Sequence, residues 1–270
     1  MGCTLTRPTE NTVRCTGKLQ PGAYSIDGGV SSQFITGLLF ALSVLDKPSS
    51  LKITGKIESR PYIELTKSAM RKFGLDPDHP GAQRYHTPGL LEVEGDWSNA
   101  AFWLGAKALG SRITVTGLDP HSVQGDQVSD SLLRIIATSH SVPVISVGDI
   151  PDLVPILSVI AAAGSGVILH DIRRLRLKES DRVATVMEMI RNLGGSAEAT
   201  EDTLTIKGTG LTGGTVNSHN DHRIAMAAAI AATVCTRPVT ITGAEAVNKS
   251  YPTFLEEYKK LGGKYEQYLR

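Results

Sequence analysis

Charged and polar residues that could handle acidic ligands recur at the starts of segments of this chain that have a helical pattern. Three of these groups are charged: Asp152, the run Lys-Glu-Ser-Asp-Arg at 178–182 and the run Asn-Asp-His-Arg at 220–223. A fourth, Ser31-Ser32-Gln33, is uncharged. The unpaired N–H groups at a helix N-terminus attract phosphate and carboxylate. If the segments that follow are helices, these groups would line a site for an anionic ligand.

Taken together, the residue types suit a transfer reaction on acidic substrates. The fixed cations are Arg182, Arg223 and Lys249. The groups able to move protons are Asp152, Glu179 and His222. Taken singly, each group has a simpler interpretation as an N-cap or a structural histidine. The basic run 173–178 could be a solvated face or an RNA-binding patch, but acidic residues interrupt it and no aromatic residues are interleaved.

The segments that must position these groups form a repeat. Four times, an apolar helix is predicted to lead into a β-rich strand, and a more charged helix follows. The predicted apolar helices are 33–45, 100–109, 153–163 and 223–234. The predicted strands are 51–55, 113–117, 167–172 and 239–243, and the second helices are 63–73, 128–137, 182–193 and 254–261. A period of roughly 50–75 residues indicates β-α-β-α-β-β modules, in which helix N-termini would meet on one surface.

The run Asp-Trp-Ser-Asn at 96–99 interrupts this pattern after a predicted strand at 90–94. A domain boundary near Gly95 is therefore expected. The first domain, 1–94, would hold about one and a half modules, and the second, 95–270, would hold three.

The first residues of the chain resemble the end of a module. Glu10-Asn11-Thr12-Val13 stands in segment 2–17 where Glu201-Asp202-Thr203-Leu204 stands in the predicted hairpin 195–208. The sequence thus predicts that the chain begins within a module and that the first domain is truncated.

Composition bounds the function further. The chain has 270 residues, 28 basic and 27 acidic side chains and a net charge of +1, so no global field would draw it to nucleic acid or a membrane. Its three cysteines are too few and too scattered for a disulfide framework or a zinc site. No signal-peptide pattern is present, and the longest apolar stretches, 153–164 and 224–235, are shorter than the ~20 residues that span a bilayer. We expect a soluble, cytoplasmic protein.

Six segments, taken in order, resemble the EPSP synthase (3-phosphoshikimate 1-carboxyvinyltransferase) family. They are Val30–Phe34, Ser59–Ile63, Gln124–Asp126, Ile150–Asp152, Leu175–Arg182 and Asn220–Met226. The resemblance runs over essentially the whole chain. It implies an α/β fold, an inside-out α/β barrel of two domains, each built from three β-α-β-α-β-β modules. The four and a half modules of this chain agree with a truncated first domain.

The resemblance also implies roles for individual residues. Those matched to shikimate 3-phosphate binding are Ser31, Ser32, Gln33, Ser59, Tyr62, Asp152, Arg174 and Lys178. Those matched to phosphoenolpyruvate binding are Gln33, Arg182, Arg223 and Lys249. The implied catalytic residues are Asp152, which takes the proton of the 5-hydroxyl, Glu179, which exchanges a proton with the methylene carbon, and His222 in the same site.

The implied activity is transfer of the enolpyruvyl group of phosphoenolpyruvate to shikimate 3-phosphate with release of phosphate, a step of aromatic amino acid biosynthesis. It needs an acid, a base and anchored anions, but no metal or cofactor. Arg174 stands where some members have asparagine. The family's Lys-Ser…Arg and Gly-Asn-Ala-Gly-Thr substrate-binding segments are absent from this sequence. We therefore expect the chain alone to be inactive, and a polypeptide carrying those segments would be a partner in trans.

Two other functions stay open. The enolpyruvyl transferase that acts on UDP-N-acetylglucosamine shares the fold, but its reactive cysteine loop has no counterpart, because Cys235 belongs to the apolar stretch 224–235, which is expected to be helical. A non-catalytic binding or scaffold module could be built from the same repeat. The set Asp152, Glu179, Arg182 and Arg223 argues against it, since a scaffold has no use for those groups.

Overall fold

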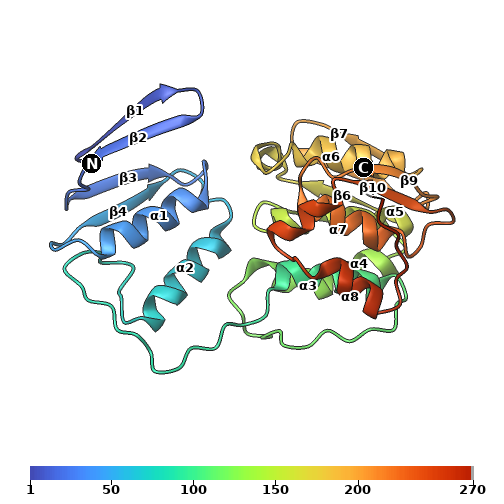
Figure 1. Ribbon diagram of the computed structural model, residues 1–270, viewed down its shortest axis with the longest axis horizontal. Helices are drawn as coiled ribbons and strands as arrows, with labels where there is room; N and C mark the ends of the chain where they lie inside the picture. The colour runs from blue at the N-terminus through green and yellow to red at the C-terminus, as the bar shows by residue number, and fades with distance from the viewer. Residues whose placement is uncertain (269–270) are drawn as a thin grey trace. The chain divides into compact units, whose positions relative to one another are not determined.

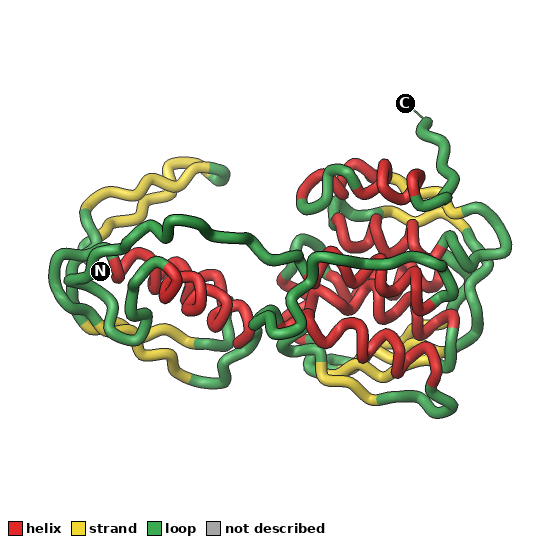
Figure 2. Tube along the Cα trace, turned by 90° about the horizontal axis from the view of Figure 1, so that it is seen from below, coloured by secondary structure: helices red, strands yellow, loops and turns green. Residues whose placement is uncertain are grey.

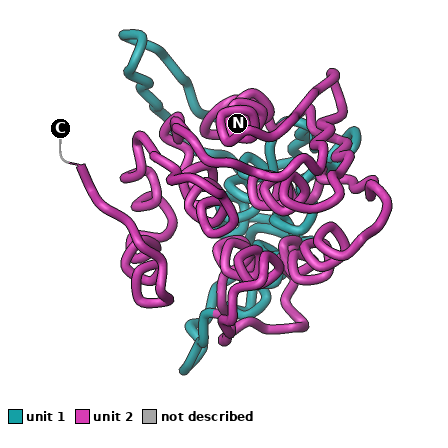
Figure 3. Tube along the Cα trace, turned by 90° about the vertical axis from the view of Figure 1, so that its right-hand side faces the viewer, with its two compact units in different colours: residues 1–93 teal, residues 94–270 magenta. Residues whose placement is uncertain are grey.

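The computed structural model describes residues 1–268, so the last two residues of the predicted domain 95–270 lie outside it. The chain forms two compact units, Met1–Val93 and a second that begins at Glu94 (Figure 3).

Unit 1 begins with a hairpin and continues as a β-α-β unit (Figure 1). Its elements are β1 (Cys3–Thr9), β2 (Thr12–Gly17), β3 (Ala23–Asp27), α1 (Ser32–Ser43), β4 (Ser50–Thr54) and α2 (Arg60–Lys72). β1 and β2 are antiparallel, whereas β3 and β4 are parallel and joined through α1. The core of the unit lies between the helices and the β3–β4 pair, around Ile35, Ile63 and Met70. A 3.0 Å hydrogen bond between the Thr36 and Thr66 hydroxyls joins the N-terminal halves of α1 and α2.

Unit 2 holds six helices among its described residues, with two groups of strands. The helices are α3 (Trp97–Ala108), α4 (Ser129–Thr138), α5 (Val154–Ala163), α6 (Arg182–Asn192), α7 (His222–Ala231) and α8 (Phe254–Lys260). The short 3₁₀ helices are η1 (Gly125–Val128), η2 (Pro151–Leu153), η3 (Arg173–Leu177) and η4 (Ala244–Lys249). The strands are β5 (Val144–Ser146), β6 (Gly166–His170), β7 (Ser196–Ala199), β8 (Thr203–Lys207), β9 (Gly214–Asn217) and β10 (Val239–Thr242).

The strands of unit 2 form a four-stranded sheet in the order β5-β6-β8-β7 and a separate β9–β10 pair. β5 pairs with β6 in parallel through α5, and β9 pairs with β10 in parallel through α7. The helices occupy the middle of the unit and strands lie toward its edges in Figure 2. Every residue of α7 is buried, as are the residues of α5 up to Ala162. The alanines of α7 let it approach the neighbouring helices closely.

The predicted repeat is confirmed at its hairpins. β7 and β8 form an antiparallel hairpin, as β1 and β2 do. At both turns two threonine hydroxyls face each other, Thr9 and Thr12 at 2.8 Å and Thr200 and Thr203 at 2.7 Å. Similar sequences therefore close both turns in the same way.

Two predicted strands are not formed. Segments 90–94 and 113–117 have no strand pairing, although the Gly95 N–H donates to the Gly117 carbonyl at 3.1 Å. Leu90 and Val93 are exposed, so neither packs against a partner strand. A β-rich sequence becomes a strand only where a neighbour completes its ladder.

Two predictions at the ends of apolar helices are also wrong. The run 96–99 is the start of α3 rather than an interruption, because the Asp96 carboxylate accepts from the Ser98 and Asn99 N–H groups. Cys235 lies beyond the end of α7 instead of within it. No helix within residues 1–268 combines the length and the apolar character needed to cross a bilayer.

Gly105 of α3 tests how closely the helices of unit 2 pack, and Gly37 of α1 in unit 1 serves as the comparison. A Cβ on Gly105 of α3 would lie 2.7 Å from Ile156 of α5, whereas one on Gly37 of α1 would meet nothing within 4 Å. Gly105→Ala should lower the free energy of unfolding by about 1–2 kcal/mol, because overpacking outweighs the gain in helix propensity. Gly37→Ala, the matched control, should raise it by about 0.5–1 kcal/mol.

Urea unfolding measures both effects. Both tryptophans, Trp97 and Trp103, are in unit 2, so their fluorescence follows Gly105→Ala, and circular dichroism follows Gly37→Ala. Stabilisation of both variants would contradict the close packing of α3 on α5.

Candidate active site

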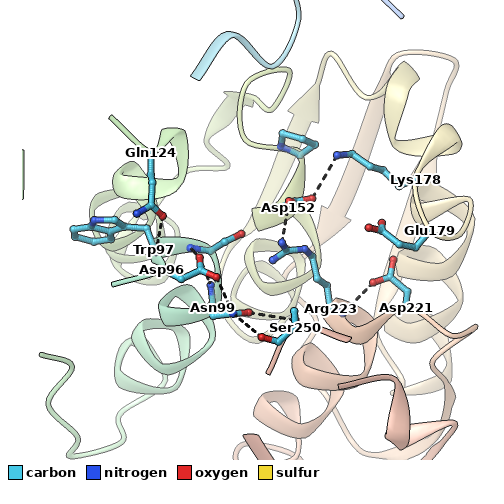
Figure 4. Close-up of polar contacts among 12 residues, drawn as sticks. Asp96, Trp97, Asn99, Gln124, Asp152, Lys178, Glu179, Asp221, Arg223 and Ser250 are labelled. Atoms are coloured by element: carbon cyan, nitrogen blue, oxygen red, sulfur yellow. Dashed lines mark hydrogen bonds and ion pairs between the residues drawn. The ribbon is translucent and has the colours of Figure 1, made fainter. Parts of the chain in front are cut away.

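The N-terminal ends of three helices meet in unit 2. Asp152 lies on η2, which leads directly into α5, and Arg182 is the first residue of α6. Arg223 lies in the first turn of α7, where the Asp221 carboxylate caps the helix by accepting from the Arg223 N–H at 2.9 Å. Figure 4 shows Asp152, Asp221 and Arg223 close together. The predicted convergence of Asp152, Arg182 and Arg223 is therefore observed.

Arg182 stands at the centre of this cluster. Its side chain is fully buried and contacts three carboxylates from different elements. The N–O distances are 2.7 Å to Asp152, 2.6 Å to Glu179 and 3.1 Å to Asp221. A buried guanidinium is tolerated because each side of its fork meets an acceptor. Arg182 therefore holds three acidic side chains in fixed positions.

Asp152 is shared among three cations. Besides Arg182, it accepts from Arg223 Nη2 at 2.9 Å and lies 3.6 Å from Lys178 Nζ. Burial alone would raise the pKa of Asp152, but the charges of Arg223, Lys178 and Arg182 outweigh burial and hold this pKa well below its ordinary value of 3.8. Asp152 is thus a firmly ionised carboxylate whose basicity depends on the surrounding cations.

Arg223 is only partly satisfied. Its Nη2 contacts Asp152, but Nε and Nη1 are buried and have no hydrogen-bond partner. Unpaired buried N–H groups are costly unless a ligand or water completes them. Arg223 therefore presents unpaired donors to an anionic ligand.

His222 precedes Arg223 and is also buried, and its Nδ1 has no partner. Burial and the neighbouring Arg223 charge lower the pKa of His222 below its ordinary value of 6.5. At neutral pH the ring is therefore mainly uncharged.

Lys249 ends η4 beside the start of α7. Its Nζ donates to the Asn220 carbonyl at 2.6 Å, immediately before the cap of α7. Asn99 of α3 donates to the carbonyl of the next residue, Ser250, at 3.2 Å (Figure 4). Contacts from α3 and α7 thus fix the segment that carries Lys249.

The remaining predicted site residues lie at other positions. Arg174 is half-buried on η3, which directly precedes Lys178. In unit 1, the Ser31 hydroxyl caps α1 by accepting from the Gln33 N–H at 3.2 Å, and Ser32 follows it. Ser59 precedes α2 with a left-handed backbone, φ 54°, and Tyr62 lies in the first turn. The unit 1 residues therefore gather at two helix N-termini.

Sequence reasoning missed three groups. Asp221 stands within the run 220–223 but received no role of its own, although its Oδ2 accepts from Arg182. Asn99 was part of an apparent interruption. Asp126 lies in the quoted motif Gln124-Gly125-Asp126 but received no role, and its Oδ1 is buried without a partner. The spacing of Asp126 from the other groups gave no signal, because only the fold brings η1 to this site.

The ion cluster makes a prediction about stability. Arg182→Met should lower the free energy of unfolding by about 3–5 kcal/mol at neutral pH, because three carboxylates lose their shared partner. In the native protein the lowered pKa of Asp152 stabilises the fold above its unfolded value of 3.8, and this stability is lost as pH falls. In Arg182→Met, carboxylates without their cationic partner can take up protons and so lose the unpaired charge. The difference in free energy of unfolding between the variant and the native protein should therefore shrink toward about pH 4.

Urea unfolding at both pH values checks this. Arg134→Met, which removes an exposed partner of Asp130 on α4, is the matched control and should change stability by less than about 0.5 kcal/mol. A deficit equal to that of the control would refute the central role of Arg182.

Comparison with known proteins identifies the family. A family model described as EPSP synthase (3-phosphoshikimate 1-carboxyvinyltransferase) matches residues 6–258. The 3-phosphoshikimate 1-carboxyvinyltransferase of Clostridium kluyveri is 38% identical over 275 residues, covering 93% of this chain and 65% of that protein. The Clostridium acetobutylicum protein of the same description is 40% identical over 269 residues, covering 92% and 63%. The chain thus spans about two thirds of the length of these curated relatives.

Solved structures share the fold. An EPSP synthase from Acinetobacter baumannii matches with a TM-score of 0.76 at 24% identity, covering 98% of this chain and 69% of that one. The enolpyruvyl transferase NikO from Streptomyces tendae matches with a TM-score of 0.66 at 15% identity, covering 97% and 69%. The family match covers nearly the whole sequence, and the mixed α/β fold agrees with it. The chain, with its ion cluster at three helix ends, therefore belongs to the EPSP synthase family.

Proposed function

We propose that this chain carries most of the catalytic groups for transfer of the enolpyruvyl unit of phosphoenolpyruvate to the 5-hydroxyl of shikimate 3-phosphate. The observation that carries the proposal is the contact of Asp152 with Arg182 and Arg223, next to the unpaired donors of Arg223. Cations that can accept an anion lie beside a carboxylate that can accept a proton. Membership of the family supplies the substrates.

Phosphoenolpyruvate would bind through Arg223. Its unpaired Nε and Nη1 each offer a hydrogen bond to an oxygen of an anionic ligand. Lys249, whose Nζ lies against the Asn220 carbonyl, would add a second positive charge. Arg182 could contact the ligand after Glu179 moves aside, because Glu179 is its most exposed partner, with 42% of the side chain accessible.

Ligand binding would also activate Asp152. The carboxylate is a weak base while three cations hold its pKa low. An anionic ligand on Arg223 and Lys178 would neutralise part of that charge and raise the pKa of Asp152. The base would therefore gain strength only when the substrate is in place, as catalysis requires.

The proposed reaction has two steps. Glu179 gives a proton to the methylene carbon while the 5-hydroxyl oxygen attacks the adjacent carbon and passes its proton to Asp152. The resulting tetrahedral adduct then breaks its carbon–phosphate oxygen bond. Glu179 regains the methyl proton, and the proton on Asp152 leaves with phosphate. A neutral His222 could donate a hydrogen bond within the site.

Unit 1 would supply further contacts to shikimate 3-phosphate. Ser31, Ser32 and Gln33 begin α1, and Ser59 and Tyr62 begin α2, where helix N-termini favour phosphate. Arg174 and Lys178 would add contacts from unit 2. We infer that the two units correspond to domains 1–94 and 95–270 of an inside-out barrel of repeated modules.

Phosphate release tests the proposal. The chain alone should release little phosphate from the two substrates, because the Lys-Ser…Arg and Gly-Asn-Ala-Gly-Thr segments are absent from its sequence. Addition of the part of the Clostridium kluyveri relative that this chain does not match should restore turnover. Arg223→Gln and Asp152→Asn should then lower kcat/KM by about 10²–10³-fold, the usual cost of a lost charge-stabilising or proton-transfer group.

The matched control is Asp130→Asn on the surface of α4, which should keep full activity. Turnover with UDP-N-acetylglucosamine in place of shikimate 3-phosphate would assign the chain to the other transferase class. Phosphate release that is unchanged by both site variants, or no binding of either substrate with the added segment, would refute the proposal.

A further inference from the structure

The turn before α7 holds two successive residues in the left-handed region of backbone conformation. His219 has φ 49° and Asn220 has φ 58°, and neither is glycine. Side chains make this region unfavourable, although asparagine tolerates it better than most residues do. Strained backbone persists where the surrounding structure imposes it, and such strain gathers at functional sites. The turn therefore needs contacts that hold it and a role that explains it.

Hydrogen bonds hold this turn and join it to the start of η4. The fully buried Ser218 hydroxyl accepts from the Asn220 N–H at 3.1 Å and donates to the Gly243 carbonyl at 2.8 Å. The Asn217 side chain accepts from the His219 N–H at 2.8 Å. Because Gly243 immediately precedes η4, the Ser218 hydroxyl fixes the turn and the beginning of η4 together.

The far end of η4 is held as well. Its last residue, Lys249, donates from Nζ to the Asn220 carbonyl at 2.6 Å. The carbonyl of the next residue, Ser250, accepts from Asn99 Nδ2 at 3.2 Å, and the same amide nitrogen donates to Asp96 at 2.8 Å (Figure 4). Both ends of η4 are therefore tied to the same turn, and α3 secures the backbone that follows.

Lys249 differs from two arginines of the candidate active site in the charge of its partner. Arg182 and Arg223 contact carboxylates, whereas the Lys249 ammonium donates to a neutral carbonyl. Its positive charge is therefore not cancelled by that partner. The residue is also exposed, and an exposed lysine ordinarily samples many rotamers. The hydrogen bond to the fixed turn gives this ammonium one preferred position beside the start of α7.

We propose that Ser218 and Asn99 are positioning residues for Lys249, and that they hold its ammonium in place before an anionic ligand arrives. Ser218 fixes the turn that presents the Asn220 carbonyl, and Asn99 fixes the backbone that follows Lys249. The benefit is entropic, because a side chain that is already ordered loses less rotamer freedom on binding. The proposal rests on the proposed function only in treating Lys249 as an anion-binding residue.

Side-chain NMR relaxation tests the positioning without a ligand. In the native 270-residue chain, the Lys249 Cε methylene should be more ordered than that of Lys107, an exposed lysine of α3. Ser218→Ala and Asn99→Ala should each lower the order parameter of Lys249 toward that of Lys107, although neither change removes the Asn220 carbonyl. Asn99 is only half-buried, so its variant keeps the test available if the buried Ser218→Ala does not fold.

Two controls separate positioning from general loosening of the fold. Ser250→Ala removes a hydroxyl 3.5 Å from Asn99 but keeps the carbonyl that Asn99 binds, so Lys249 should stay ordered. Gly105→Ala, which is expected to destabilise unit 2 without removing a contact of η4, should also leave Lys249 ordered. A native Lys249 as mobile as the reference lysine, or native order of Lys249 in either folded positioning variant, would overturn the proposal.

Inorganic phosphate tests the consequence for binding. Titration at constant ionic strength should shift the Lys249 signals to saturation and leave those of Lys107 in place. Asn99→Ala should raise the half-saturating phosphate concentration about two- to tenfold, the usual cost of ordering one long side chain on binding, and Ser250→Ala should not change it. Lys249 signals that phosphate does not move, or an unchanged half-saturating concentration in Asn99→Ala, would contradict the proposal. Because no substrate is turned over, failure of the transfer reaction with these results intact would count against the proposed function alone.

Discussion

The pairing of one buried guanidinium with three carboxylates organises the second unit. Arg182 has no exposed surface, yet it carries a full charge into the centre of the molecule, where an unpaired ion would be prohibitively unfavourable. Asp152, Glu179 and Asp221 relieve that cost only if the starts of α5, α6 and α7 stand at fixed distances from one another. The contacts of Arg182 therefore fix both the positions of these helices and the geometry of the candidate active site.

The packing of small residues makes that constraint possible. Half of the residues of α7 are alanine and the helix is buried along its whole length, so it can approach α5 and α3 closely. Gly105 lies against Ile156 with no room for a methyl group. Bulky side chains at these positions would separate the helix ends and pull the carboxylates away from Arg182. The apolar core thus sets the distances on which the electrostatics depends.

Much of this arrangement could be predicted from sequence, because caps and periodicity are local signals. Asp181 and Asp221 mark helix starts, and the sequence predicts the helices that follow them to within a few residues. Features that depend on tertiary neighbours could not be predicted. Segment 113–117 has a strand-like composition but lacks pairing, and Asp96 caps a helix within what looked like an interruption. No spacing rule indicated that Arg182 would be saturated with carboxylates while Arg223 kept unpaired donors, since that difference arises from burial and side-chain direction.

The most direct test of this account is an NMR titration of the Asp152 carboxyl carbon. If Arg182, Arg223 and Lys178 surround this side chain, the pKa of Asp152 should lie well below the ordinary aspartate value of 3.8. Replacing Arg182 with methionine should raise the pKa of Asp152 toward that ordinary value. An Asp152 carboxyl that titrates at or above 3.8 in the native protein would show that the buried ion cluster does not exist in solution.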